Sequence, residues 1–348
     1  MALGISFAII AATGGPPGAA ASALWDGAFG STSQIAGTLA KTIPLILVAL
    51  GWIVAFSTRR INIGFEGQIL IGGVMAAVVG LKLGTPPAPI HLAIGVVAGI
   101  AAGAAYAGIA AWLWARRSVN EIISTLLLNF VAIQLVSWLV RGPLQEPTHG
   151  FPRTADLPQT ARWPRLIADT SLSWDLLVAA AMVFVIWFVL KRTAFGFRLR
   201  LTGASEEAAR HAGIATTRVT VSAFLISGGL AGLAGSSLIL AGESGSMSDN
   251  FSAGYGFAGI VVALLARNSP VGVVPAALLF AALRQGGGLM EARVGISSAL
   301  VLITQGLVIL LVAGTGFLFE RLSAARVDTA EEAKARAAPA TTLAGVKE

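Results

Sequence analysis

The sequence contains no cysteine and little charge. Only 12% of its 348 residues are Asp, Glu, Lys or Arg, against about 25% in an ordinary soluble domain. The absence of cysteine excludes a disulfide scaffold and thiolate chemistry. The mean hydropathy is +0.79 and 55% of the residues are hydrophobic. Polar side chains at this density cannot cover a water-facing surface, so most of the surface must face lipid.

The residues on which enzymes rely are also scarce. The three histidines, His91, His149 and His211, are scattered, and their spacing suits neither zinc nor a catalytic triad. The P-loop pattern Gly-x-x-x-x-Gly-Lys-Ser/Thr does not occur. We therefore expect no metal, no bound cofactor and no enzymatic activity in this chain. The net charge of +7 comes from basic residues between apolar runs, which orient membrane helices, so we expect no nucleic-acid partner.

Apolar runs of about 20 residues can cross a membrane as helices, because a helix satisfies its own backbone in lipid. We expect spans near 36–57, 66–83, 89–114, 120–140, 174–191, 218–241, 255–268, 270–286 and 296–318. The sequence Asn-Ser-Pro at 268–270 predicts that 255–286 forms two short or discontinuous helices. Residues 1–13 form either a signal peptide or, as we favour, a shortened first helix. The prediction is an all-α integral membrane protein with nine or ten transmembrane helices.

Most of the 24 lysines and arginines follow alternate spans on one side, which is therefore predicted to be cytoplasmic. The chain then divides into an N-terminal lead-in (1–35), a transmembrane domain (36–318) and a cytoplasmic tail (319–348). A long loop at 141–173 is placed outside, and a basic loop at 196–217 is placed inside.

Small residues recur at helical spacing in two of the expected spans. Gly95, Gly99 and Gly103 are four residues apart, as are Gly228 and Gly232. Such stripes let neighbouring backbones approach closely in membranes. They predict helix packing and carry no chemistry.

Residues 62–68, Asn-Ile-Gly-Phe-Glu-Gly-Gln, place a carboxylate between two glycines beside an apolar run. A charge at bilayer depth costs about 2.5–3.5 kcal/mol even on insertion scales, so it suggests function. The glycines suit a discontinuous transporter helix. Alternatively, Glu66 lies at the cytoplasmic interface, where it caps its helix or pairs with Arg59 or Arg60.

Two further stretches are polar. Asn129 and Gln134 lie in the apolar run that follows Asn120 and Glu121, and they need partners within the membrane. They either line a pathway, which we favour for Asn129, or join helices, which we favour for Gln134. In the basic loop, Ser205 predicts the start of a short helix and Gly213 its end. A helix this short is only marginally stable by itself, and we therefore expect it to dock on another surface. An ordinary connecting loop is the alternative.

At these motifs the sequence resembles the permease subunits of bacterial ABC importers of the ribose and branched-chain amino acid type, and most of all the nucleoside branch. The motif at 62–68 matches that branch, and residues 120–129 and 254–270 resemble its second and third signatures. Residues 203–214 resemble the segment that couples to the ATPase, although Ser205-Glu206 stands where Asn-Pro is expected.

The resemblance implies a permease with an inverted repeat, in a bacterial plasma membrane and with a cytoplasmic C-terminus. ATP is used by a separate ATP-binding subunit. Its other implied partners are a second permease chain, an extracytoplasmic solute-binding protein facing 141–173, and a small-molecule substrate. The expected pathway residues are Asn62, Phe65, Glu66, Gln68, Asn129 and Phe257. The expected coupling residues are Gly203, Ser205, Glu206, Ala208, Ala209 and Gly213.

Nucleoside uptake is the leading function. A simple sugar such as ribose is the second candidate substrate, and a branched-chain amino acid is the third. A different class of protein, a proton-coupled secondary transporter with Glu66 as its proton site, stays open at this stage.

Overall fold

The computed structural model describes residues 16–84, 86–148, 150–242 and 245–295, together with Ala11, Ser297, Ile303, Gln305 and Gly306, and this part of the chain is helical. The helices are α2 (Pro17–Phe29), α3 (Thr32–Phe56), α4 (Phe65–Lys82), α5 (Ala88–Arg117), α6 (Glu121–Arg141), η1 (Gln159–Ala161), α7 (Asp175–Arg192), α8 (Ala194–Ala204), α9 (Glu206–His211), α10 (Thr216–Leu240), α11 (Tyr255–Leu265) and α12 (Val273–Val294).

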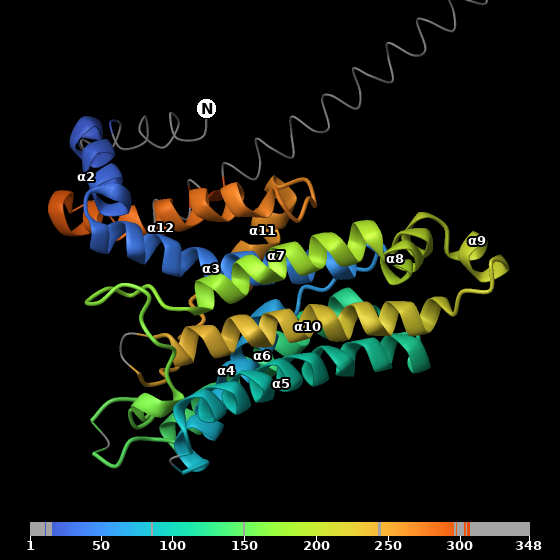
Figure 1. Cartoon of the computed structure of the whole chain (residues 1–348), viewed down its shortest axis with the longest axis horizontal. Helices are drawn as coiled ribbons and strands as arrows, with labels where there is room; N and C mark the ends of the chain where they lie inside the picture. Colours follow the sequence, from blue (N-terminus) through green and yellow to red (C-terminus); the bar gives the residue numbers. More distant parts are fainter. Residues whose placement is uncertain are drawn as a thin grey trace, which may run out of the picture.

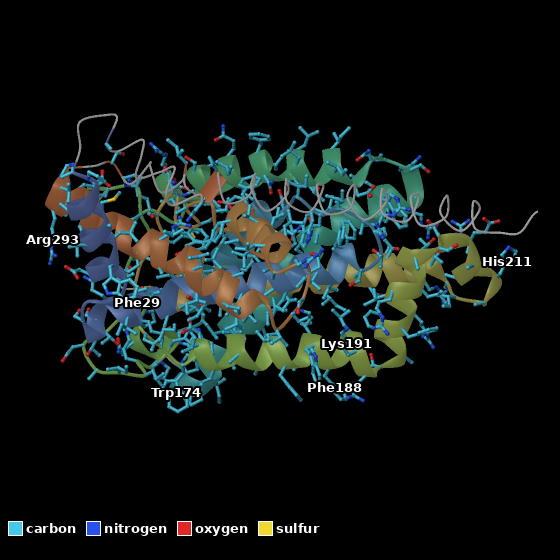
Figure 2. The ribbon with its side chains drawn as sticks, turned by 90° about the horizontal axis from the view of Figure 1, so that it is seen from above. Phe29, Trp174, Phe188, Lys191, His211 and Arg293 are labelled. Atoms are coloured by element: carbon cyan, nitrogen blue, oxygen red, sulfur yellow. The ribbon has the colours of Figure 1, made fainter. Side chains whose placement is uncertain are left out.

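The long helices run along the length of an elongated bundle (Figure 1). Helices α8 and α9 lie at one end, which we call the basic end. The connections 142–174 and 241–254 lie at the other, which we call the loop end. Figure 2 shows Phe29 and Arg293 at the loop end and His211 at the basic end.

Among the described residues, six helices are long and apolar enough to cross a membrane: α3, α4, α5, α6, α10 and α12. The pair α7 and α8, bent by 70°, forms a seventh if it counts as one broken span. These helices confirm the predicted all-α membrane protein. For all but α12, the expected bounds agree with the structure within a few residues. The expected span 296–318, the tail 319–348 and most of 1–13 lie outside the described residues.

The stretch 255–286 breaks where the sequence predicted, but only its first part is short. Helix α11 has 11 residues, and Arg267 and Asn268 adopt positive φ angles of 53° and 55° in the turn after it. The expected end of the next helix at 286 is wrong, because α12 continues to Val294. Gly286, at the expected end, is a contact point: a methyl group on it would lie 2.2 Å from the carbonyl oxygen of Leu24.

That contact belongs to α2, which the sequence predicted only as a lead-in. Helix α2 packs on α12 near the loop end, where Arg293 Nη1 lies 3.0 Å from Asp26 Oδ2. A second close approach joins Gly27 to Leu289, since a methyl group on Gly27 would lie 2.7 Å from the Leu289 Cβ. The lead-in is therefore a packed element of the bundle.

The glycine stripes cross at the centre of the bundle, as predicted. A methyl group on Gly232 of α10 would lie 2.2 Å from the carbonyl oxygen of Gly99 on α5. On Gly103 it would lie 2.4 Å from the Gly228 carbonyl oxygen, and on Gly72 of α4 it would lie 2.4 Å from the Gly232 Cα. Helices α4, α5 and α10 thus touch backbone to backbone, which only glycine allows.

We expect Gly232→Ala to destabilise the protein by about 2 kcal/mol or more, because the added methyl group meets backbone that no side-chain rotation can relieve. Thermal unfolding in detergent measures the change. Gly288→Ala is the matched control, because no atom from another element of the described structure lies within 4 Å of its added methyl group. Its melting temperature should stay near that of the unaltered protein. Equal stability of the two variants would contradict the crossing.

Candidate functional site

Helices α4 and α11 both begin inside the bundle and run in opposite directions. Asn62 bonds both to Gln68, in the first turn of α4, and to Ser227, near the middle of α10. Helix α4 therefore starts about halfway along α10. It ends at the loop end, where Gly80 contacts Leu157. Helix α11 leads toward the basic end, because Asn268 beyond it accepts a hydrogen bond from Trp52 Nε1 at 3.1 Å. Opposed half-helices of this kind are what an inverted repeat predicts.

The carboxamide of Asn62 organises the start of α4. Its Oδ1 accepts from the Gly64 N–H at 2.9 Å and from Gln68 Nε2 at 3.0 Å. Its Nδ2 donates to Gln68 Oε1 at 3.1 Å and to Ser227 Oγ at 3.0 Å. Asn62 is fully buried, and these bonds satisfy polar groups that lipid cannot.

Asn129 of α6 supports the extended segment before α4 from the other side. Its Oδ1 accepts from the Gly67 N–H at 2.8 Å, and its Nδ2 donates to the Ile63 carbonyl at 2.9 Å. Thr125 Oγ1 accepts from the Ile63 N–H at 3.2 Å. The residues of two sequence motifs, 62–68 and 120–129, therefore form one buried polar site.

Glu66 joins α4 to α11. One carboxylate oxygen accepts from the hydroxyl of Ser252 and from the Gly254 N–H at 3.0 Å, and the other accepts from the Gly256 N–H at 2.8 Å. The carboxylate thus satisfies N–H groups at the start of α11, where the helix dipole also favours negative charge. Gly256 must be glycine, since an added methyl group would lie 2.4 Å from the Glu66 backbone nitrogen.

Five of the six expected pathway residues therefore meet at this junction: Asn62, Phe65, Glu66, Gln68 and Asn129, all of them buried. The alternative placed Glu66 at the cytoplasmic interface, where it caps its own helix or pairs with Arg59 or Arg60. In the structure its carboxylate instead caps α11 inside the bundle. Phe257 stands apart, with 44% of its surface exposed on α11. A direct role of these residues in the pathway stays a prediction.

The basic loop contains two helices, where the sequence predicted one. Helix α8 is additional, and Gly203 holds it against the end of α3, because a methyl group there would lie 2.3 Å from the Ser57 carbonyl oxygen. Helix α9 begins and ends as expected: Ser205 Oγ accepts from the Ala208 N–H at 3.1 Å, and Gly213 adopts a positive φ of 77°.

The faces of α9 differ from the expected docking surface in one residue. Ala209 is fully buried within the chain, so it supports α9 from beneath and cannot itself meet a partner. The exposed residues of α9 are Glu207, Ala208, Arg210 and His211. A surface of this loop that binds a partner is built from these residues and from the exposed Ser205, Ala212 and Gly213 beside them.

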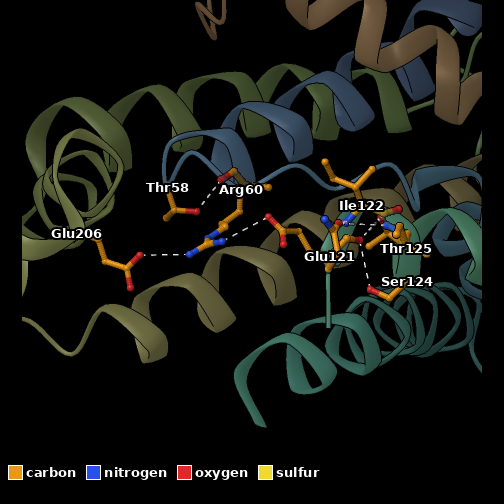
Figure 3. A network of polar contacts seen from close by, with 10 residues as sticks. Thr58, Arg60, Glu121, Ile122, Ser124, Thr125 and Glu206 are labelled. Carbon is orange, nitrogen blue, oxygen red and sulfur yellow. Dashed lines mark hydrogen bonds and ion pairs between the residues drawn. The ribbon is translucent and has the colours of Figure 1, made fainter. Parts of the chain in front are cut away.

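Arg60 connects α9 to the bundle (Figure 3). Its Nη2 lies 3.2 Å from Glu206 Oε2, and its Nη1 lies 3.6 Å from Glu121 Oε1 at the start of α6. The guanidinium also lies over the ring of Trp114 on α5, 4.5 Å from its centroid. A single cation therefore bridges three helices, two residues before the extended segment that Asn62 and Asn129 organise.

Glu206 should make the attachment of α9 depend on pH. Its hydrogen bond from Arg210, at 2.5 Å, and the nearby charge of Arg60 hold the pKa of the Glu206 carboxyl below its ordinary value. A lowered pKa stabilises the folded state above the ordinary glutamate value, and the stabilisation is lost as pH falls through the lowered one. We expect α9 amide hydrogens to stay protected, after correction for intrinsic exchange, from neutral pH down to the ordinary glutamate range. Their protection should fall only below it.

Hydrogen exchange measured by mass spectrometry tests this expectation. In Glu206→Gln, α9 should exchange faster at neutral pH as well, because the charge is gone. Glu207→Gln, which alters an exposed neighbour, is the control and should behave like the unaltered protein. Protection of α9 that is independent of both pH and Glu206 would contradict the prediction.

A polar cavity of about 420 Å³ lies between α3, α7, α10 and α12, and sequence analysis did not predict it. Its polar lining includes Gln34, Lys41, Ser173, Asp175, Ser237 and Gln285. Asp175, the first residue of α7, is only 3% exposed and accepts a hydrogen bond from the Ser237 hydroxyl. The one signal in the sequence was a carboxylate at the start of an apolar run.

Comparison with known proteins agrees with this architecture. Residues 34–313 match the family described as branched-chain amino acid transport system, permease component. The chain is 39% identical to a glucose ABC transporter permease of Haloferax volcanii, over 90% of this chain and 84% of the relative. It is 35% identical to a guanosine ABC transporter permease of Bacillus subtilis, over 84% and 85%. It is 29% identical to a nucleoside ABC transporter permease of Lactococcus lactis, over 89% and 87%.

The family match covers most of the chain and runs from the first turn of α3 to beyond the end of α12, so that of the described helices only α2 lies outside it. Its members are transport subunits, which fits a bundle with several membrane-spanning helices and a polar site at its centre. The chain is therefore a multi-pass membrane protein that belongs to this family of ABC transporter permeases.

Proposed function

We propose that this chain is the membrane-spanning subunit of an ATP-driven importer for nucleosides. The observation that supports the substrate is similarity along almost the whole chain to permeases named for guanosine and nucleosides. The motif at residues 62–68, which resembles the nucleoside branch, points the same way. The chain itself needs no catalytic residues, because ATP is hydrolysed by a separate subunit.

The two ends of the bundle suit different partners. The basic end, where α8 and α9 project (Figure 1), faces the cytoplasm in this proposal and receives the ATP-binding subunit. A solute-binding protein delivers substrate to the loop end, where residues 142–174 lie. A second permease chain completes the pathway, and the C-terminus lies in the cytoplasm.

A simple sugar is the second candidate substrate. It is favoured by the relative named for glucose, which shares 39% of its residues with this chain. A nucleoside contains a sugar ring, so both candidates present neighbouring hydroxyl groups. Only the nucleoside adds a flat base, for which an exposed aromatic side chain such as Phe257 is suited.

Uptake by the complete transporter tests the proposal. The four kinds of subunit are expressed in bacteria that lack their own nucleoside and glucose uptake, and radiolabelled uridine, guanosine and glucose are supplied separately. We expect nucleoside uptake that disappears when the ATPase is inactivated. Uptake of glucose alone would make a simple sugar, and not a nucleoside, the substrate. Uptake that survives loss of the ATPase and stops with a protonophore would support a secondary transporter instead.

A further inference from the structure

The cavity between α3, α7, α10 and α12 is polar in a part of the chain that is otherwise apolar. It measures about 420 Å³, within the range of small-molecule sites. Two of its lining residues, Ser171 and Gly242, belong to the connections at the loop end, so the cavity lies near that end. The cavity is therefore on the side where, in our proposal, substrate arrives.

Polar side chains that converge on one cavity of a membrane protein often line a solute or ion route. Here they come from four separate helices and meet in one place. Gln34 and Gln285 join α3 to α12 across the cavity through a hydrogen bond of 2.6 Å between Gln285 Nε2 and Gln34 Oε1. Lys41 adds a positive charge about two helical turns further along α3 than Gln34.

Asp175 is the feature that points to a ligand. One carboxylate oxygen accepts from the Ser237 hydroxyl, while the other, Oδ1, is buried and has no hydrogen-bond partner among the described residues. The hydroxyl of Ser173, which also lines the cavity, is equally without a partner in that part of the chain. Buried polar atoms are normally satisfied, so these two atoms, which the cavity lining covers, have bonding capacity that a solute can reach when the lining side chains move.

The inner wall of the cavity leads to the junction of α4 and α11. Tyr255 lines the cavity, and its two neighbours Gly254 and Gly256 donate the N–H groups that Glu66 accepts. A solute in the cavity would therefore lie beside the point where the two half-helices meet. This position is suited to a site that passes substrate inward.

We propose that this cavity is a solute-binding site within the single permease chain, and that Asp175 with Ser173 and Ser237 binds neighbouring hydroxyl groups of a sugar ring. The inference rests on the proposed function for the direction of transport. The chemistry is shared by the ribose of a nucleoside and by a free sugar. A carboxylate and hydroxyls suit both, since they accept hydrogen bonds from the ring hydroxyls.

The absence of cysteine makes a direct test simple, because one introduced cysteine is the only thiol of this chain, and its labelling can be read on this chain after the subunits are separated by gel electrophoresis. Ala40→Cys places it in the cavity lining, and Ala168→Cys places it in the exposed loop before α7 as the control. The complete transporter in nanodiscs, without ATP, is treated with a charged thiosulfonate in the presence of uridine, 2′,3′-dideoxyuridine or glucose. We expect uridine to slow labelling of Ala40→Cys at least fivefold and to leave Ala168→Cys unchanged.

The analogues and a second substitution define the chemistry. Dideoxyuridine, which lacks the neighbouring hydroxyls, should protect much less than uridine. Protection should be lost in Asp175→Asn, with Ser237→Ala as a milder variant if Asp175→Asn does not assemble. Protection by glucose and not by uridine would support the cavity as a binding site and assign it to a free sugar.

Two results would overturn the site: labelling that no solute slows, and equal protection by uridine and dideoxyuridine. Uptake measured with the same preparations separates the two proposals. Nucleoside uptake without protection at Ala40→Cys would leave the proposed function standing and remove the cavity from it. Protection without uptake would support the cavity as a binding site and contradict the proposed function in nucleoside uptake.

Discussion

Glu66→Ala should reduce solute uptake at least about tenfold and lower the melting temperature of the purified protein. The substitution removes the acceptor for the N–H groups of Gly254 and Gly256. Each buried donor left without a partner costs about 1–3 kcal/mol. Water could not easily replace the carboxylate, because Glu66 is only 5% exposed. Uptake in cells and thermal unfolding in detergent measure the two effects.

Glu66→Gln separates two roles of this carboxylate. The amide keeps the shape and one acceptor, so the protein should still assemble. If the charge acts in the pathway, as the sequence predicted, uptake should fall several-fold in a variant of nearly normal stability. Normal uptake by Glu66→Gln would assign Glu66 to holding α11 in place and nothing more. Glu207→Gln, which alters an exposed glutamate on α9, is the control for the effect of losing one negative charge on the melting temperature.

The helices could be predicted because their signals are local. Asn120 caps α6 by accepting from the Ile122 N–H at 2.8 Å, and Ser205 caps α9 in the same manner. The glycines of α5 and α10 are evenly spaced along each helix, so their close packing was visible as well. Each of these features depends on residues within a few positions of one another.

The partners of the polar residues could not be predicted, because they are distant in the sequence. Glu66 bonds to residues 186 to 190 positions away. The end of α12 was misjudged for the same reason, since the contact between Gly286 and α2, which lies far away in the sequence, cannot be seen locally. The cavity has no local pattern, because α3, α7, α10 and α12 each contribute a few of its polar side chains.

The burial of Ala209 shows a second limit. Helix α9 has six residues, fewer than two turns, so its sequence contains no period that distinguishes a buried face from an exposed one. Small side chains at 208 and 209 looked equally suited to contact a partner. Only the arrangement of α9 on the bundle shows that Ala208 is exposed and Ala209 is not.

Arg60→Ala should uncouple transport from ATP hydrolysis. The guanidinium is the shared cation of Glu206 on α9 and Glu121 on α6. Two residues further along the chain, Asn62 holds the start of α4. Without Arg60, movement of α9 has no charged connection to this region. We expect uptake to fall about tenfold or more, while ATP hydrolysis continues and no longer responds to the loaded solute-binding protein.

The neighbouring Arg59 supplies the matched control, because it carries the same charge and is exposed. Arg59→Ala should transport and hydrolyse ATP almost normally. Arg60→Lys should be intermediate, since one ammonium group cannot reproduce the contacts of a planar guanidinium with two carboxylates and the Trp114 ring. The ATP-binding subunit should copurify with all three variants, because the exposed residues of α9 are unchanged. Full coupling in Arg60→Ala would show that α9 acts on the bundle by another route, of which the contact between Gly203 and the end of α3 is the nearest.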